Sequence, residues 1–106
     1  MSNKPLPPYY AVIFTSVRTD NDDGYAGMIE HMLDIGLKYP GCLGIESVNE
    51  GSTGISVSYW KNLDSIKAWK ENADHDVAQR LGRERWYKSY TTRIAKVEKE
   101  YSFEKV

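Results

Sequence analysis

The spacing of apolar and polar residues along the chain predicts alternating strands and helices. Segment 9–18 is rich in aromatic and β-branched residues and runs into the turn-forming sequence 19–24, so we expect a first strand that ends in a loop. Across 25–38 the apolar residues recur every three or four positions, which predicts an amphipathic helix. Pro40 and Gly41 should end that helix, because neither residue favours its continuation.

The middle of the chain predicts a hairpin. Two short strand-like runs, 43–48 and 55–60, are separated by a loop that contains two glycines. A second helical stripe extends from Ile66 to Leu81, and Asn62 or Asp64 can cap its start.

The end of the chain predicts one more strand. Asp74 and His75 can break the second helix into two pieces. A turn follows at 83–87, and segment 89–101 then alternates in the manner of a strand.

The resulting order is β-α-β-β-α-β, which favours an α+β, ferredoxin-like fold. Right-handed crossovers place both helices on one face of a four-stranded antiparallel sheet. The first strand carries apolar residues on both faces, for example Val12 and Phe14 on one side and Ile13 on the other. Since an uncovered apolar sheet face is unfavourable in water, we predict a homodimer that packs sheet against sheet.

Composition narrows the class of protein. The chain has 106 residues, with 14 Lys and Arg against 15 Asp and Glu and a net charge of -1, which supports one domain. We expect residues 1–8 to form a flexible tail and 9–106 to form the domain.

Balanced charge argues against nucleic-acid binding, and no apolar stretch is long enough to cross a membrane. The polar first residues lack the apolar region of a signal peptide, so we expect a cytoplasmic protein. A lone Cys42 predicts no internal disulfide and no thiolate metal site.

Several stretches together resemble the antibiotic biosynthesis monooxygenase (ABM) domain family. They are 40–47, 55–60 with Trp69 nine residues on, 73–75, 82–87 and 101–103. The resemblance implies a dimeric α/β barrel with a pocket in each subunit between the sheet and its own helices. Members include cofactor-free oxygenases of polycyclic aromatic polyketides and haem-degrading enzymes.

Individual positions differ from both enzyme branches. The polyketide oxygenases have an Asn four positions before the strand-end Trp and a Tyr six positions after it. Trp60 matches that Trp, but Ser56 and Ile66 stand at the other two positions. In the haem-degrading branch a Trp is followed ten residues later by the haem-ligating His. Trp69 matches this Trp, and Gln79 stands in place of the His.

His75 is the candidate catalytic base. It is the only side chain in the second half of the chain whose ordinary pKa lies near neutrality, as proton abstraction from a phenol or quinol requires. On a continuous helix it lies about 240° around the axis from Trp69, on the side of Gln79. It would therefore face a pocket only if the helix breaks near Asp74, and a structural or capping role is the alternative.

Aromatic residues are the candidate pocket lining. Trp60, Trp69 and Trp86 could shape a cavity for a flat aromatic ligand, although a thin core and a dimer interface also need large aromatic residues. Tyr59 is expected in the core, whereas Trp60 lies on the side of Ser56.

Three functions follow from these residues. The first is a cofactor-independent monooxygenase that acts on an aromatic, quinol-type substrate. His75 would be its base and the three tryptophans would line the pocket, with Ser56 and Gln79 as polar groups that contact the substrate. The alternatives are a haem-binding, haem-degrading monooxygenase and a non-catalytic module that binds a small ligand.

Overall fold

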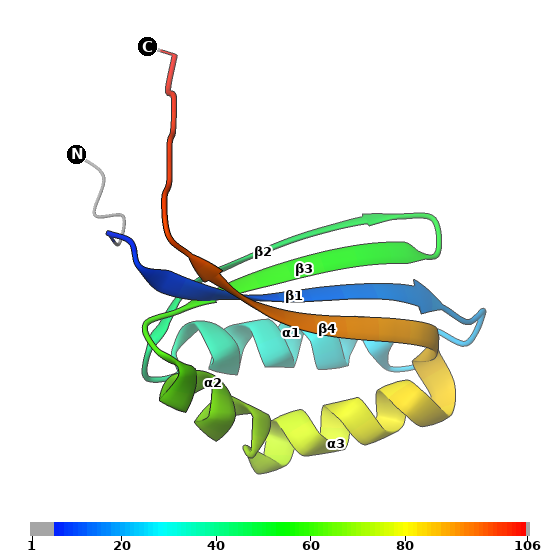
Figure 1. The fold of residues 1–106 in the computed structure, drawn as a ribbon. Coiled ribbons are helices and arrows are strands. Elements are labelled where there is room, and N and C mark those ends of the chain that lie inside the picture. The colour runs from blue at the N-terminus through cyan, green and yellow to red at the C-terminus, as the bar shows by residue number, and fades with distance from the viewer. Residues whose placement is uncertain (1–5, 106) are drawn as a thin grey trace.

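The structure, a computed structural model, describes residues 6–105, apart from the side chains of Ala73 and Asp74 (Figure 1). Every strand and helix that the pattern predicts is present, in the predicted order. The elements are β1 (Tyr9–Arg18), α1 (Tyr25–Leu37), β2 (Cys42–Glu50), β3 (Thr53–Trp60), α2 (Leu63–Lys70), α3 (Ala73–Leu81), the single π turn η1 (Gly82–Trp86) and β4 (Tyr87–Val97). Residues 1–5 of the expected tail lie outside the described residues.

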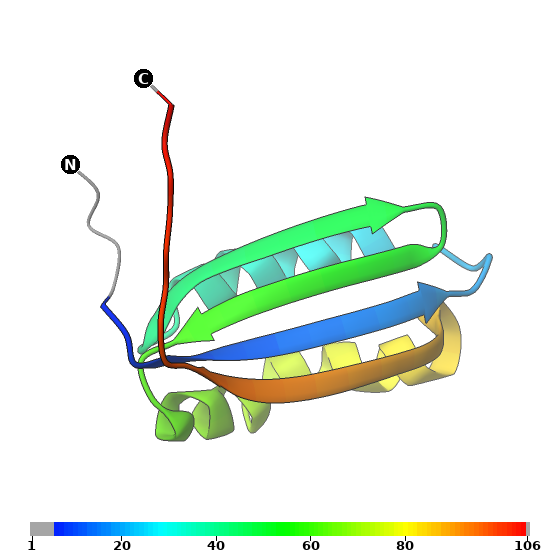
Figure 2. The same cartoon turned by 45° about the horizontal axis from the view of Figure 1, so that its top comes forward.

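The strands form one antiparallel sheet in the order β2-β3-β1-β4 (Figure 2). The helices α1, α2 and α3 all lie on the same side of this sheet (Figure 1). The predicted ferredoxin-like fold is therefore confirmed. None of the helices within residues 6–105 has the length and apolar character needed to span a membrane.

Trp60 sets which face of the sheet carries the core. Its side chain is 0% exposed, and its ring lies 6.1 Å from the ring of Trp69 on α2, so its side of β3 faces the helices. Tyr59 points to the opposite face, because neighbouring residues of a strand alternate. The expectation that Tyr59 is the core residue was therefore wrong. Ile55, Val57 and Tyr59 make their side of β3 the more apolar one, but the helices cover the other side, where serines alternate with Trp60.

The second helix is broken, but earlier than Asp74. Asn62 caps α2 by accepting a hydrogen bond from the backbone N–H of Ser65 at 2.8 Å. The helix ends at Lys70, and α3 begins at Ala73. Asn72 starts the new helix, since its side-chain oxygen accepts from the backbone N–H of His75 at 3.3 Å.

The last strand is shorter than predicted. It ends at Val97, which pairs with Tyr9 at the start of β1. Residues 98–101 were expected to continue the strand, but β1 offers no further residue for pairing. The chain instead leaves the sheet on the side opposite the helices (Figures 1 and 2).

The face of the sheet away from the helices is apolar along its centre. On β1 it carries Ile13 and Val17, and on β3 it carries Val57, which pairs with Ile13. All three side chains are partly exposed. No element among the described residues covers this face.

Candidate active site around His75

The break between α2 and α3 brings His75 against Trp69. The imidazole ring lies 4.8 Å from the ring of Trp69, and the two planes are inclined by 39°. On an uninterrupted helix these two side chains would point to different sides. The capped break at Asn72 therefore decides that His75 turns toward the aromatic interior and not away from it.

The Nδ1 atom of His75 is buried and has no hydrogen-bond partner among the described residues. Burial lowers the pKa of the imidazole below its ordinary value of 6.5. A hydrogen bond to the Lys70 backbone and the Asp76 carboxylate offset this effect only in part. The ring is thus neutral at pH 7.

Trp69 links His75 to the core of the protein. Its ring lies 5.1 Å from Tyr39 and 6.1 Å from Trp60. The Trp60 indole N–H donates to the Ser58 hydroxyl at 2.8 Å. Helix α1 approaches this cluster at Gly36, where a Cβ atom would lie 3.5 Å from the Trp69 ring. Trp60 is thus held as a packing residue, and the half-buried Trp69 forms the wall beside His75.

Trp86 does not join this cluster. It is 3% exposed, and its indole N–H donates to the Asp23 carbonyl at 2.9 Å. Its backbone carbonyl accepts from Thr19, just after β1, whereas Trp60 pairs with Tyr10 near the start of that strand. Trp86 therefore packs at the opposite end of the sheet from Trp60.

Beside Trp86 lies a group of aromatic residues that the sequence did not reveal as a unit. Phe14 contacts Tyr87 and Tyr90 at ring distances of 5.4 and 5.2 Å, and Tyr25 shares a 3.3 Å hydrogen bond with the Tyr87 hydroxyl. The Arg18 guanidinium lies 4.2 Å from the centre of the Tyr25 ring. Burial and the bond to Tyr25 raise the pKa of Tyr87 far above its usual range.

The position of Tyr87 in this aromatic group depends on an irregularity in strand pairing. The register between β1 and β4 shifts between Val17 and Arg18, so that Arg18 pairs with Tyr87 while Val17 pairs with Ser89. Such a bulge turns a side chain to the other face of the sheet. Nothing in the alternation of segment 89–101 signals it.

The polar candidates Ser56 and Gln79 are not neighbours. Ser56 lies on the helix side of β3, opposite Phe14 in register, and is partly exposed. Gln79 lines a surface hollow of about 550 Å³ together with four charged residues of the α2 and α3 region, Lys67, Lys70, Glu71 and Asp76. An amide in such a charged surface hollow does not fit a haem ligand.

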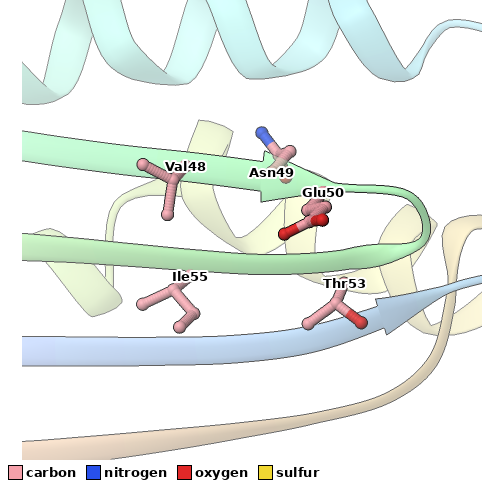
Figure 3. A pocket seen from close by; sticks show the side chains of 5 residues that line it. All are labelled: Val48, Asn49, Glu50, Thr53 and Ile55. Atoms are coloured by element: carbon pink, nitrogen blue, oxygen red, sulfur yellow. The ribbon is translucent and has the colours of Figure 1, made fainter.

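A second surface hollow, of about 590 Å³, lies on the β2–β3 hairpin (Figure 3). Neither hollow lies between the sheet and the helices. Even so, helix-facing side chains in the middle of the sheet keep partial exposure, namely Val12, Phe14, Ser56 and Ser58. The helices therefore do not cover these side chains completely in the single chain.

The described residues offer little support for a metal site or a reactive thiol. Among the described side chains, no group of three or more His, Cys, Asp or Glu is placed to hold a metal ion. Burial raises the pKa of the half-buried Cys42 thiol, and a bond to the Gly44 backbone opposes this only in part. Cys42 is therefore a protonated thiol at neutral pH.

Sequence comparison gives a family and a close relative. Residues 8–81 match the family described as Antibiotic biosynthesis monooxygenase. The chain is 46% identical over 105 residues to YqjZ of Bacillus subtilis (strain 168), a protein described as uncharacterized, and the match covers 98% of this chain and 92% of that protein.

Solved structures show the same fold. Rv0793 from Mycobacterium tuberculosis matches with a TM-score of 0.78 at 11% identity, over 89% of this chain and 99% of that one. SnoaB, a cofactor-independent oxygenase from Streptomyces nogalater, matches with a TM-score of 0.74 at 6% identity, over 87% and 95% of the two chains. At such low identity these likenesses establish the fold alone.

Proposed function

Since this chain belongs to the antibiotic biosynthesis monooxygenase family, we propose that it is a cofactor-independent monooxygenase that oxidises a quinol-type aromatic substrate. The observation that carries the proposal is the imidazole of His75, partly buried against Trp69 with a buried, unpaired Nδ1. The description of SnoaB as a cofactor-independent oxygenase shows that this fold supports such chemistry in another protein.

His75 acts as the general base. Its lowered pKa keeps the ring neutral at physiological pH, so Nδ1 can accept a proton from a phenol placed within hydrogen-bond reach. Trp69 covers one side of the imidazole and offers an aromatic surface to a flat ligand. The substrate would lie beside Trp69 on the helix side of the sheet, the side on which Ser56 also lies.

The deprotonated substrate supplies the electrons. A quinol ring that loses its phenolic proton is rich enough in electrons to react with O2 without another reductant. One oxygen atom then replaces a ring hydrogen, the second leaves as water, and the product is a hydroxyquinone. The protein's part is to create and hold the anion, since proton transfer to a placed base contributes about 10²–10⁴-fold to rate.

We further propose that the working form is a homodimer. The apolar centre of the free sheet face, with Ile13, Val17 and Val57, is the surface that a second copy would cover. Covering it would also stiffen the sheet on which Ser56 and Phe14 stand.

The test is oxygen incorporation from isotopically labelled O2 into naphthalene and anthracene quinols. The proposal predicts one labelled atom in the product and a rate above that of buffer. His75→Ala should slow turnover at least about a hundredfold, while His31→Ala, on the exposed side of α1, should not. Turnover by His75→Ala at the wild-type rate would refute the role of His75.

Two outcomes would point to the other functions. Quinol binding without turnover in any member of the panel would indicate a non-catalytic binding module. A haem absorption band on titration with hemin, lost in His75→Ala, would indicate a haem protein. Either result would overturn the proposed reaction.

A further inference from the structure

Two irregularities of the backbone meet at Tyr87. This residue directly follows the π turn η1, and it lies opposite Arg18, where the pairing of β1 with β4 shifts. Gly82 leaves space for the phenol, because a Cβ atom at that position would lie 2.7 Å from the Tyr87 ring. Single π turns and β-bulges are both frequent at functional sites, where a bulge re-aims a side chain. The backbone around Tyr87 therefore indicates a functional role for this side chain.

The Tyr87 hydroxyl has a hydrogen-bonding capacity that the protein does not use up. Among the described residues its hydrogen-bond partner is the Tyr25 hydroxyl, at 3.3 Å, and either oxygen can be the donor. A bond between two phenols uses one of their two protons, so the other proton remains for a further acceptor. The bond is longer than the about 2.5–3.0 Å usual between two oxygens, so little is lost if Tyr25 becomes the donor and Tyr87 gives its proton to a ligand.

Of the two phenols, Tyr87 is the one beside the surface proposed for the substrate. Its ring lies 5.4 Å from that of Phe14, which is on the helix side of β1 and is partly exposed. Tyr25 has no ring contact with Phe14 among the described residues. It packs instead against Trp86 at 5.5 Å, with the Arg18 guanidinium 4.2 Å from its ring centre. Burial and the bond to Tyr25 raise the pKa of Tyr87 above its usual range, so this phenol remains a donor at physiological pH.

The candidate base and Tyr87 lie toward opposite ends of the helix-facing side of the sheet. The His75 end is marked by Trp60, which pairs with Tyr10 on β1. Phe14, the neighbour of Tyr87, follows Tyr10 by four residues, which is about 13 Å along a strand. A ligand that contacts both His75 and Tyr87 is therefore an elongated polycycle and not a single ring.

We propose that Tyr87 is a second polar anchor for the substrate, and that it donates a hydrogen bond to an oxygen atom at the end of an elongated polycyclic phenol remote from His75. This inference rests on the proposed function, which places the reacting phenol at His75. Tyr87 takes no part in the proton transfer. Its hydroxyl selects ligands that carry an oxygen atom at both ends and fixes which end meets Nδ1 of His75.

Binding of two matched ligands tests the anchor without turnover. One is an anthracene with a hydroxyl on each terminal ring, and the other has a hydroxyl on one terminal ring only. Both are titrated in the absence of oxygen and followed by ligand fluorescence. Tyr87→Phe should reduce the preference for the first ligand at least about threefold, because one hydrogen bond is lost while the ring stays in place. Tyr25→Phe should keep the preference, since Tyr87 retains its own proton.

Three results would overturn the anchor. They are an equal preference in wild type and Tyr87→Phe, a loss of preference confined to Tyr25→Phe, and no binding of either anthracene.

Turnover separates the anchor from the base. With an anthracene quinol that carries a further hydroxyl on its remote terminal ring, Tyr87→Phe should raise KM at least about threefold and leave kcat within about twofold. An unchanged KM in Tyr87→Phe would refute the anchor and leave the role of His75 intact. If the wild type oxidises no quinol, the proposed reaction is refuted, and the binding measurement still decides the anchor.

Discussion

When the chain folds, the Nδ1 atom of His75 is removed from water and gains no hydrogen bond from the described residues. A buried polar atom without a partner costs about 1–3 kcal/mol, so the unpaired Nδ1 lowers the stability of the fold. Such unpaired groups occur where a ligand completes the bonding. The same burial that lowers the pKa of His75 keeps the ring unprotonated at pH 7.

A pH dependence of stability follows from this burial. The unfolded chain takes up the His75 proton near pH 6.5, whereas the folded chain resists it to lower pH. The neutral ring thus contributes its full stability above pH 6.5, and that contribution is lost as the pH falls toward the folded pKa.

His75→Phe should remove this dependence. A phenyl ring keeps the contact with Trp69 and has no proton to gain, so the free energy of unfolding should fall less between pH 7 and about pH 5 than in wild type. Urea unfolding at both pH values measures the difference. Equal losses in the two proteins would mean that the fold does not lower the pKa of His75.

At the scale of elements, the break between α2 and α3 positions the candidate base. Asn72 caps α3 and Asn62 caps α2, so the two short helices meet at an angle that a single helix would not allow. The site therefore depends on a cap that touches no substrate.

The two caps form a matched pair for a test. Replacing either Asn by Ala should cost about 1 kcal/mol of stability. Only Asn72→Ala should also weaken the pH dependence of unfolding, because a continuous helix would turn His75 away from Trp69 toward water. If Asn62→Ala changes that pH dependence equally, the break is not what places His75.

Sequence patterns predicted the elements well where periodicity is long and the residues are strongly apolar. The stripe of α1 and the aromatic and β-branched run of β1 belong to this class, and both agree with the structure within a residue. His75 could be chosen as the candidate base from residue type alone. Its contact with Trp69 could not be predicted, because the capping side chain of Asn72 decides where the helix breaks.

Other features are set by pairing between distant strands. The side on which Trp60 lies could not be chosen, since Ser56 and Ser58 give the helix-facing side of β3 a polar pattern. The bulge that gathers Tyr87 with Tyr90 and the early end of β4 both depend on the register with β1. A register is a property of two segments, and neither segment carries it alone.

For the whole molecule, the single chain has few fully buried apolar side chains. Tyr9, Ala11, Trp60, Ile66 and Trp86 are the buried hydrophobic residues among those described. Both sides of the sheet are therefore incompletely covered: Val12, Phe14, Ser56 and Ser58 keep partial exposure on the helix side, and the other side keeps an apolar surface. A ligand on the first side and a second copy on the other would complete the packing.

The decisive measurement is an NMR titration of the His75 imidazole nitrogens in the wild-type protein. We expect the ring to be neutral at pH 7, with its proton on Nε2 so that Nδ1 can act as the base, and to titrate below pH 6.5. A ring that titrates at or above pH 6.5, or that carries its proton on Nδ1, would contradict the assignment of His75 as a buried base.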